Sequence, residues 1–537
     1  MPGKAAPNAV FDFVIVGGGS AGCVLASRLS ANPAHRVCLL EAGPTDDSPL
    51  VRVPAGIIAL MRSRKRNWRY RTCAQRHLGG RELYIPRGKT LGGSSAVNAM
   101  IYTRGHAWDY DHWVELGNPG WGWSDVLPIF RRSENNTRGA DAYHGTGGPL
   151  DVADVAFSHP VSEAFVAACV QAGYPPNHDF NGAVQEGVGL YQVTQTGGER
   201  CSVARGYLHP VTSRPNLTVL TNTLATRVVI DGKRAVGVAC VGDAGARTIE
   251  AGTVILSGGT INSPQLLLLS GIGARSQLEP HGIRQVHDLP GVGRNLQDHP
   301  DILVVQRSQR HDTLSLGPGY LPQAITGLYR YLVKREGAFT SNVAEAGGFI
   351  KSGTDAAIPD LQLHLSAALL DQHGLNWKFA TGWGYSAHVC VLRPRARGSV
   401  SLKDANPASH AVIDPDLLGD PDDVESLLGG LKIVRGILQQ DALAPWRGDE
   451  IFPGGDVRDD AGLRGYLRAK AETIYHPVGT CRMGNDAMAV VDSKLKMHGI
   501  DGLYVVDASV MPSLIGGNTN APTVMIAEKA ADGILGS

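Results

Sequence analysis

The sequence predicts an α/β protein with two domains, and three observations support this fold class. A strand, a glycine-rich turn, a helix and a second strand follow one another within residues 13–41. A strand at 503–507 and a helix at 522–534 repeat this pattern near the C-terminus. The chain has 537 residues, more than a single hydrophobic core usually holds. We therefore expect a first domain built from discontinuous segments, with a second domain inserted between them.

The stretch at 13–41 has the features of a dinucleotide-binding turn. A β-branched run at 14–16 predicts a strand, and apolar residues at helical spacing after the turn predict a helix. The turn between them matches the pattern GxGxxG, which lets a pyrophosphate approach the backbone at a helix N-terminus. The matching residues are Gly17, Gly19 and Gly22. Glu41 follows the second strand, where an acid accepts hydrogen bonds from ribose hydroxyls. The motif predicts a Rossmann-like domain, but it does not separate NAD from FAD.

A second glycine-rich block lies at 87–100, with the sequence RGKTLGGSSAVNAM. Its small residues suit a loop pressed against a flat ring or a phosphate, because larger side chains would hold the ligand away. An ordinary turn is the alternative. The length of the block, in a chain that already carries a dinucleotide motif, favours a cofactor loop.

Further elements are predicted along the chain. Apolar spacing predicts a helix over 160–172 and another that starts at Ser263 and Pro264. Alternation and β-branched runs predict strands, and Asp231-Gly232 between two of them indicates a hairpin. These strands span 217–220, 227–230, 235–240 and 253–257. Residues 306–473 carry no phosphate-type loop, so we expect them to form most of a substrate-binding domain.

The composition argues against several classes of protein. The formal net charge is zero, so no general electrostatic field favours nucleic acid. The eight cysteines form no CxxC pair and show no zinc-ligand spacing, which predicts reduced thiols, no metal site and a cytoplasmic location. The start of the chain resembles neither a secretory signal nor a transit peptide. No apolar run is long enough to span a bilayer.

Two segments combine apolar and basic residues. An apolar run at 57–61 precedes a basic run at 62–71, and the apolar stretch at 314–332 is followed by Lys334 and Arg335. The segment at 57–71 is expected to be a solvated surface, and the stretch at 314–332 is expected to be a core or capping helix. The alternative for either segment is a lid or a peripheral contact with the inner face of a membrane.

Five blocks together resemble the glucose-methanol-choline (GMC) family of FAD-dependent oxidoreductases. They are GGGSAG at 17–22 with Glu41, GKTLGGSSAVN at 88–98, GTINSPQLLLLSGIG at 259–273, HPVGTCRMG at 476–484 and VVDASVMPSLIGGNTNAPTVMIAEKAAD at 505–532. The resemblance implies an FAD-binding domain of residues 8–156, 201–305 and 474–537. It implies a substrate-binding domain, with an antiparallel sheet and helices, of residues 157–200 and 306–473.

The resemblance also implies the catalytic residues. His476 matches the family's catalytic histidine, and a neutral imidazole suits the abstraction of a hydroxyl proton. Asn518 falls where family members carry a second histidine or an asparagine, and its amide would donate to the developing alkoxide. Asn520 is the alternative to Asn518, and either asparagine would also suit the start of a helix before Pro522.

The cofactor residues implied by the resemblance span both glycine-rich blocks and the C-terminal block. They are Gly17, Gly19, Ser20, Ala21, Gly22, Glu41, Ala42, Arg87, Gly88, Leu91, Gly92, Gly93, Ser94, Asn98, Ala99, Met100, Val228, Asp507, Ala508, Asn518 and Thr519. Val228 is expected to contact adenine through its backbone. Val97 stands where members with a histidyl-linked flavin carry histidine, so we expect FAD to be bound without a covalent bond.

The implied reaction is oxidation of a primary aliphatic or aromatic alcohol to the aldehyde, with electrons passed to a quinone or another acceptor. Choline dehydrogenase, an alcohol oxidase that uses O₂ and a flavin-dependent lyase are the alternatives. Choline would need an acid and aromatic faces, for which Glu345, Trp383 and Tyr385 are available. The sequence leaves the alcohol, the acceptor and the oligomeric state open.

Overall fold

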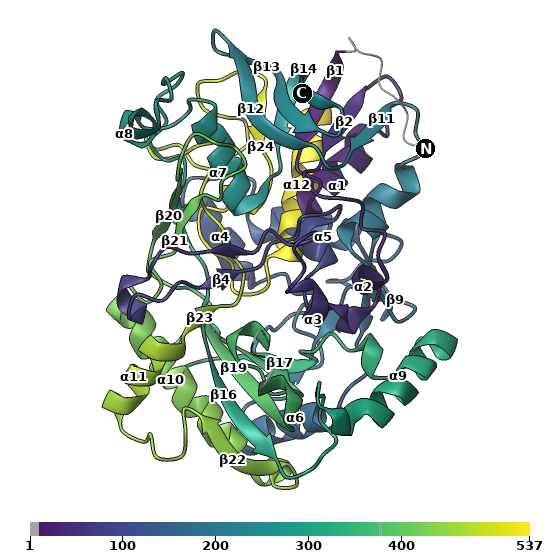
Figure 1. Ribbon diagram of the computed structural model, residues 1–537, viewed down its shortest axis with the longest axis vertical. Coiled ribbons are helices and arrows are strands. Elements are labelled where there is room, and N and C mark those ends of the chain that lie inside the picture. The colour runs from purple at the N-terminus through teal and green to yellow at the C-terminus, as the bar shows by residue number, and fades with distance from the viewer. Residues whose placement is uncertain (1–9, 375, 377–378, 537) are drawn as a thin grey trace.

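The computed structural model describes residues 10–374, 376 and 379–536. Two regions, each built around its own sheet, lie at opposite ends of the molecule (Figure 1). The sheet that contains β1 lies at the upper end, and the sheet that contains β16 lies at the lower end. This confirms the predicted α/β class with two domains. The outermost residues of the expected first domain, 8, 9 and 537, lie outside the described residues.

The sheet of the first domain combines a parallel and an antiparallel part. In spatial order its strands are β11 (Leu217–Leu220), β2 (Val37–Leu40), β1 (Phe11–Val16), β14 (Gly245–Leu256), β13 (Arg234–Gly242) and β12 (Leu224–Asp231), and β24 (Leu503–Val505) pairs with the end of β14. Strands β11, β2, β1, β14 and β24 run parallel, and β12 to β14 are antiparallel. Because layers of structure cover both faces of the parallel part, strands such as β2 are apolar and buried throughout.

The helices of this domain come from distant parts of the chain. They are α1 (Ser20–Leu29), α4 (Ala107–Glu115), α5 (Trp123–Ser133), α7 (Gly259–Leu269), α8 (Arg275–Leu278) and α12 (Asn520–Leu535). Helix α1 packs against α12, and α12 packs against α5. Glu528 of α12 is buried and forms ion pairs with Arg28 of α1 and Arg132 of α5. The N-terminal and C-terminal segments therefore form one core.

Helix α7 begins at Gly259, four residues before the start expected at Ser263. Pro264 lies inside the helix and has no N–H to donate to the carbonyl of Thr260. The hydroxyl of Thr480 donates to that carbonyl instead, at 2.6 Å, and the hydroxyl of Thr260 donates to the carbonyl of Pro477, at 2.7 Å. A side chain from a distant segment thus allows the helix to start before the proline.

The second domain is built on an antiparallel sheet, as expected. Its strands in spatial order are β22 (Arg447–Phe452), β16 (Pro300–Ser308), β19 (Gly384–Val391), β18 (Leu361–Ser366), β17 (Ala346–Ile350) and β7 (Gly187–Leu190), and β23 (Glu472–Thr473) also pairs with β16. Strand β16 begins before the boundary expected at 305/306, and the domain boundaries stay a prediction. Helices α6 (Pro160–Gln171), α10 (Pro421–Leu438) and α11 (Asp460–Lys470) pack with the sheet around a second core.

The remaining helices and strands lie outside the two main sheets and their cores. The helices are α2 (Pro49–Arg52), α3 (Ile57–Leu60) and α9 (Leu321–Lys334). The strands are β3 (Tyr70–Arg71), β4 (Tyr84–Ile85), β5 (Glu134–Asn136), β6 (Leu150–Asp154), β8 (Gln192–Val193), β9 (Gln195–Thr196), β10 (Glu199–Arg200), β15 (Arg294–Leu296), β20 (Gly398–Ser401) and β21 (Val412–Asp414). Among the described helices, none combines the length and the apolar character that crossing a membrane requires.

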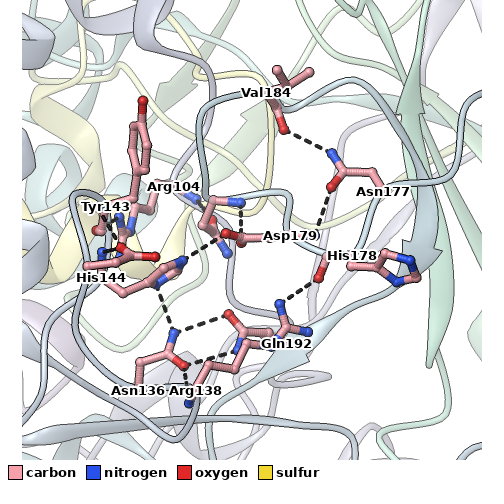
Figure 2. A network of polar contacts seen from close by, with 12 residues as sticks. Arg104, Asn136, Arg138, Tyr143, His144, Asn177, His178, Asp179, Val184 and Gln192 are labelled. Carbon is pink, nitrogen blue, oxygen red and sulfur yellow. Dashed lines mark hydrogen bonds and ion pairs between the residues drawn. The ribbon is translucent and has the colours of Figure 1, made fainter.

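A buried ionic network joins the segment after α5 to the loop before β7. Figure 2 shows the ring of His144 between Asn136 and Asp179. Its two nitrogens lie 2.9 Å from Asp179 Oδ2 and 3.0 Å from Glu134 Oε1, and Arg104 lies 2.7 Å from the same Glu134 oxygen. Burial alone would lower the pKa of His144, but the hydrogen bonds and charges of the two acids outweigh it and raise the pKa to about 9. His144 is therefore charged in the folded protein at neutral pH.

We expect this network to make stability depend on pH. The folded pKa of His144 lies above the unfolded value near 6.5, so its contribution is complete below pH ~6.5 and is lost as the pH rises through about 9. The contribution is on the order of 3 kcal/mol. The difference in unfolding free energy between the wild type and His144→Gln, measured by denaturant titration, should shrink over this window. A constant difference from pH 6.5 to 9 would contradict the assignment.

Candidate active site

A cavity of about 1350 Å³ lies between the two domains. The first domain lines it with the turn at 17–21, with Glu41 and with the loop at 97–100. The second domain contributes one face of its sheet, including Leu303, His364 and His388 from β16, β18 and β19. The residues directly before and after each of these three belong to the core of the second domain. This alternation is expected, because successive side chains of a strand point to opposite faces of its sheet. The cavity thus places the dinucleotide motif opposite the antiparallel sheet.

The two glycine-rich blocks touch each other at the wall of the cavity. A Cβ atom on Gly93 would lie 2.7 Å from the Cα of Gly19, so a larger residue would push the two loops apart. A Cβ atom on Gly22 would lie 1.9 Å from the carbonyl oxygen of Gly17, so this position holds α1 close to its turn. Helix α1 has no capping side chain at its N-terminus. Its first N–H groups are therefore available to an anion at the cavity.

Glu41 is fixed at the end of β2 by the turns around it. Its carboxylate accepts hydrogen bonds from the N–H of Gly18 at 2.9 Å and from the N–H of Gly43 at 2.7 Å. Burial raises the pKa of Glu41 to about 7, although these two hydrogen bonds and the charge of Lys89 oppose the rise. The carboxylate is therefore held at the cavity wall with a defined orientation.

The second glycine-rich block is supported from behind by Arg200. This buried guanidinium donates to the carbonyls of Ser95 and Asn98, at 3.2 and 2.6 Å, and to Asn98 Oδ1 at 2.8 Å. Burial lowers the pKa of Arg200 to about 9. The loop therefore keeps its shape through a buried cation that donates mainly to backbone carbonyls.

His476 and Asn518 meet at the cavity. Asn518 Nδ2 lies 3.1 Å from His476 Nε2, and His476 Nδ1 lies 3.2 Å from His299 Nδ1. His299 Nε2 lies 3.1 Å from the carbonyl oxygen of Ile515, which can only accept. The proton of His299 is therefore on Nε2, its Nδ1 accepts from His476 Nδ1, and His476 Nε2 is left as the basic nitrogen. This basic nitrogen accepts from the amide of Asn518.

The orientation of the Asn518 amide is set by two further residues. Asn518 Oδ1 accepts from Gln362 Nε2 at 3.1 Å and from the hydroxyl of Thr103 at 3.3 Å. Its nitrogen therefore faces His476. Asn520, the alternative in the sequence, accepts a hydrogen bond from the hydroxyl of Ser20 at 2.7 Å instead. The geometry selects Asn518 as the neighbour of His476.

The surroundings keep His476 neutral. Burial lowers the pKa of His476 well below its usual value, and the charges of His299, His364 and Arg87 would oppose its protonation further. Burial also lowers the pKa of His299 to about 3. Both rings are therefore neutral at physiological pH, and the hydrogen-bond direction between them is preserved.

The second domain adds a paired acid and base to the cavity. His388 Nδ1 lies 2.8 Å from Asp301 Oδ2. Burial would lower the pKa of His388, but the charge of Asp301 and its hydrogen bond outweigh burial and raise it. His364 lies directly opposite His388 on the neighbouring strand. In the described part of the chain, no group of three or more His, Cys, Asp or Glu side chains could hold a metal ion.

The structure brings most of the predicted site residues to one cavity. The residues that line it are Gly17, Gly19, Ser20, Ala21, Glu41, Ala42, Arg87, Gly88, Gly93, Ser94, Asn98, Ala99, Met100, His476, Asp507, Ala508, Asn518 and Thr519. Four predicted residues are not part of this lining: Gly22, Leu91, Gly92 and Val228. Gly22 and Gly92 shape the loops, since Gly92 N–H donates to the carbonyl of Gly18 at 2.8 Å.

Val228 does not reach the cavity. It is buried in β12, and its N–H donates to the hydroxyl of Ser270 at 2.8 Å. The start of the same strand lies at the cavity instead, through Leu224 and Ala225. The expected contact of Val228 with adenine therefore stays a prediction.

The residues considered for a quaternary ammonium group do not form a site. Glu345 is buried and accepts hydrogen bonds from the hydroxyls of Ser162 and Ser341. The hydroxyl of Tyr385 donates to Gln306, and Trp383 stacks on His311. None of the three lines the cavity.

Sequence reasoning missed His299, His364, His388 and Arg200. The two histidines on β18 and β19 occupy alternating positions of apolar strands, but only the pairing of those strands brings them together. His299 lies in the polar run at 297–301, between two strand signals, which is the one local hint of a functional role.

The residues present fit the FAD that the sequence resemblance implies. Free N–H groups at the start of α1 and the close glycine contacts suit a pyrophosphate. The cavity continues from Glu41 past the loop at 97–100 to His476, which suits an elongated dinucleotide. At the loop 97–100 the cavity is lined by Val97, whose side chain is apolar and mostly buried.

The chain is similar over almost its whole length to known dehydrogenases. It is 49% identical to the alcohol dehydrogenase [acceptor] of Pseudomonas putida, over 98% of this chain and 96% of that protein. It is 45% identical to the mitochondrial choline dehydrogenase of Homo sapiens, over 98% of this chain and 90% of that protein.

Solved structures show the same fold. Pyridoxine 4-oxidase from Mesorbium loti is 34% identical, with a TM-score of 0.88, over 98% of this chain and 99% of that one. An FAD-dependent oxidoreductase from Chaetomium thermophilum is 27% identical, with a TM-score of 0.88 and the same coverage. Sequence models described as GMC oxidoreductase match residues 11–301 and 394–527. The chain therefore belongs to the GMC oxidoreductase family, as its five sequence blocks predicted.

Proposed function

We propose that this protein is an FAD-dependent alcohol dehydrogenase that oxidises a primary alcohol to its aldehyde. The observation that carries the proposal is the pair of His476 and Asn518, a neutral base beside an amide donor at a cavity wall shared with the dinucleotide motif. The similarity to the alcohol dehydrogenase [acceptor] of Pseudomonas putida supports it.

The residues that would hold FAD are those of the two glycine-rich blocks. The N-terminus of α1 would bind the pyrophosphate, Glu41 would accept from the ribose hydroxyls, and Asp507 and Ala508 would lie along the ribityl chain. Bound FAD would supply an acceptor for the hydride of the alcohol.

His476 would act as the base for the hydroxyl proton, and Asn518 would stabilise the alkoxide. An alcohol oxygen between these residues meets an acceptor at His476 Nε2 and a donor at Asn518 Nδ2. His299 is a positioning residue, because its Nδ1 holds the proton of His476 on the nitrogen remote from Asn518. The base is therefore ready without a prior change in protonation.

The rest of the cavity favours a neutral, apolar alcohol. Leu303, Leu314, Phe339 and Leu369 line it, and aliphatic or aromatic chains would bury apolar surface against them. Asp301 is already paired with His388, so its charge is balanced.

Choline is the second candidate substrate, because human choline dehydrogenase is 45% identical and Glu472 lines the cavity beside Asp301. The electron acceptor would be a quinone or another carrier. An oxidase would use O₂, and a flavin-dependent lyase would form an aldehyde without reducing the flavin.

Anaerobic mixing of the purified holoprotein with a panel of alcohols tests the reaction. We expect aliphatic or aromatic primary alcohols to bleach the visible flavin band quickly, and choline to do so slowly. Readmitting air separates a dehydrogenase, which stays reduced, from an oxidase. Faster bleaching by choline would favour the second candidate, and aldehyde formation without bleaching would favour a lyase.

The variants His476→Ala and Asn518→Ala test the two proposed catalytic roles. Loss of the base should slow flavin reduction about 10²–10⁴-fold while the folded protein keeps its flavin. Because the pKa of His476 is well below 6.5 and the neutral form is active, the wild-type rate should stay level from pH 8 to about 6 and fall only below that. Stopped-flow traces check both points. A rate that already falls below pH 7, or near-normal reduction by His476→Ala, would remove His476 from this role.

Release of the flavin tests the expectation that FAD is bound without a covalent bond. Val97 offers no atom that could be linked to the flavin, so acid precipitation should leave the yellow colour in the supernatant. Flavin that remains with the precipitated protein would contradict this expectation.

A further inference from the structure

Helix α9 exposes a continuous apolar face. Six of its side chains have exposed fractions between 44% and 64%: Leu321, Ile325, Leu328, Tyr329, Leu332 and Val333. The positions 321, 325, 328 and 332 follow helical spacing, so they form one stripe along the helix. The sequence left a core or capping helix and a membrane-facing patch open for this stretch, and in the structure the stripe faces outward.

The opposite face of α9 anchors the helix to the protein. Gly327 and Tyr331 are its buried residues, and both pack against Phe339. Figure 1 shows α9 at the periphery of the molecule, below α2 and α3. The exposed stripe is thus a fixed surface feature and not a frayed segment.

Exposed basic side chains lie on the polar side of α9 and directly after α3. Arg330 and Lys334 lie on the polar side of α9, and both are exposed. Arg62, Arg64 and Lys65 follow α3 and are also exposed. The nearby acids are fewer: Glu336 lies 3.7 Å from Arg330, and Glu199 lies 3.6 Å from Arg335. The rim of the patch is therefore positively charged overall.

The same patch surrounds one end of the cavity. Leu316, Leu328 and Leu332 line the cavity and are exposed as well, so the cavity reaches the surface here. On the other side, Leu50 and Ile57 line it from α2 and α3. An apolar molecule that leaves this surface would enter the cavity without crossing water.

We propose that α9 and the segment 50–66 form a docking surface for an anionic lipid bilayer, with α9 lying in the plane of the interface. The apolar stripe would enter the boundary between headgroups and acyl chains, and the basic rim would contact the anionic headgroups. A second copy of the chain is a poorer occupant, because a two-fold contact would bring the same basic residues face to face. The proposal does not depend on which substrate the enzyme oxidises.

Sedimentation of the holoprotein with vesicles tests the proposal. We expect binding to vesicles of phosphatidylcholine mixed with phosphatidylglycerol, and much weaker binding to phosphatidylcholine alone or at high salt. The variant Leu321→Glu with Ile325→Glu should weaken binding about tenfold or more, because two apolar side chains become charged. Neither residue lines the cavity, so flavin content and the rate with a soluble acceptor report that the variant is folded.

The matched control is Val184→Glu with Val286→Glu, which adds the same charges at exposed apolar sites away from α9. This variant should keep wild-type binding, whereas Arg64→Glu with Lys65→Glu should lose the preference for phosphatidylglycerol. Equal loss in the control would overturn the proposal, as would equal binding to both kinds of vesicle. The proposal would also fail if the wild type binds neither kind of vesicle and forms a dimer in solution that the variant Leu321→Glu with Ile325→Glu dissociates.

Discussion

The site depends on a row of hydrogen bonds that begins at the carbonyl of Ile515 and passes through His299 and His476 to Asn518. A carbonyl oxygen can only accept, and this fixes the direction of every bond in the row. The row holds only while both rings are neutral, since a protonated His299 would place two donors against each other. Burial of His299 is therefore as important to the site as its identity.

Strand pairing in the second domain sets the distance between the two histidines. Strands β16 and β23 pair through Pro300 with Thr473 and through Asp301 with Glu472. His299 comes directly before β16, and His476 follows β23 by three residues. The backbone N–H of His476 also donates to Asp298 Oδ1 at 2.8 Å. The sheet that lines the cavity thus also positions His476, the proposed base, while Asn518 lies in the segment before α12.

The predictability of the fold and the site from the sequence differs from region to region for physical reasons. The strand, turn, helix and second strand at 13–41 are encoded locally, so their order and the place of Glu41 after the second strand could be predicted. His476 and Asn518 were found through motif resemblance, but only the side-chain geometry separates Asn518 from Asn520. His364 and His388 depend on the pairing of two distant strands, which no local pattern states. The early start of α7 depends on the hydroxyl of Thr480, more than two hundred residues away.

The two hydrogen bonds of Thr260 have a consequence for how the enzyme can move. They tie the segment 477–480, directly after His476, to α7 of the first domain. The residues before His476 are tied to the sheet of the second domain through β23. A hinge motion that separated the domains would pull His476 away from one of these anchors. We therefore expect molecules to enter and leave the cavity through rearrangement of side chains and short helices at its mouth, without separation of the two sheets.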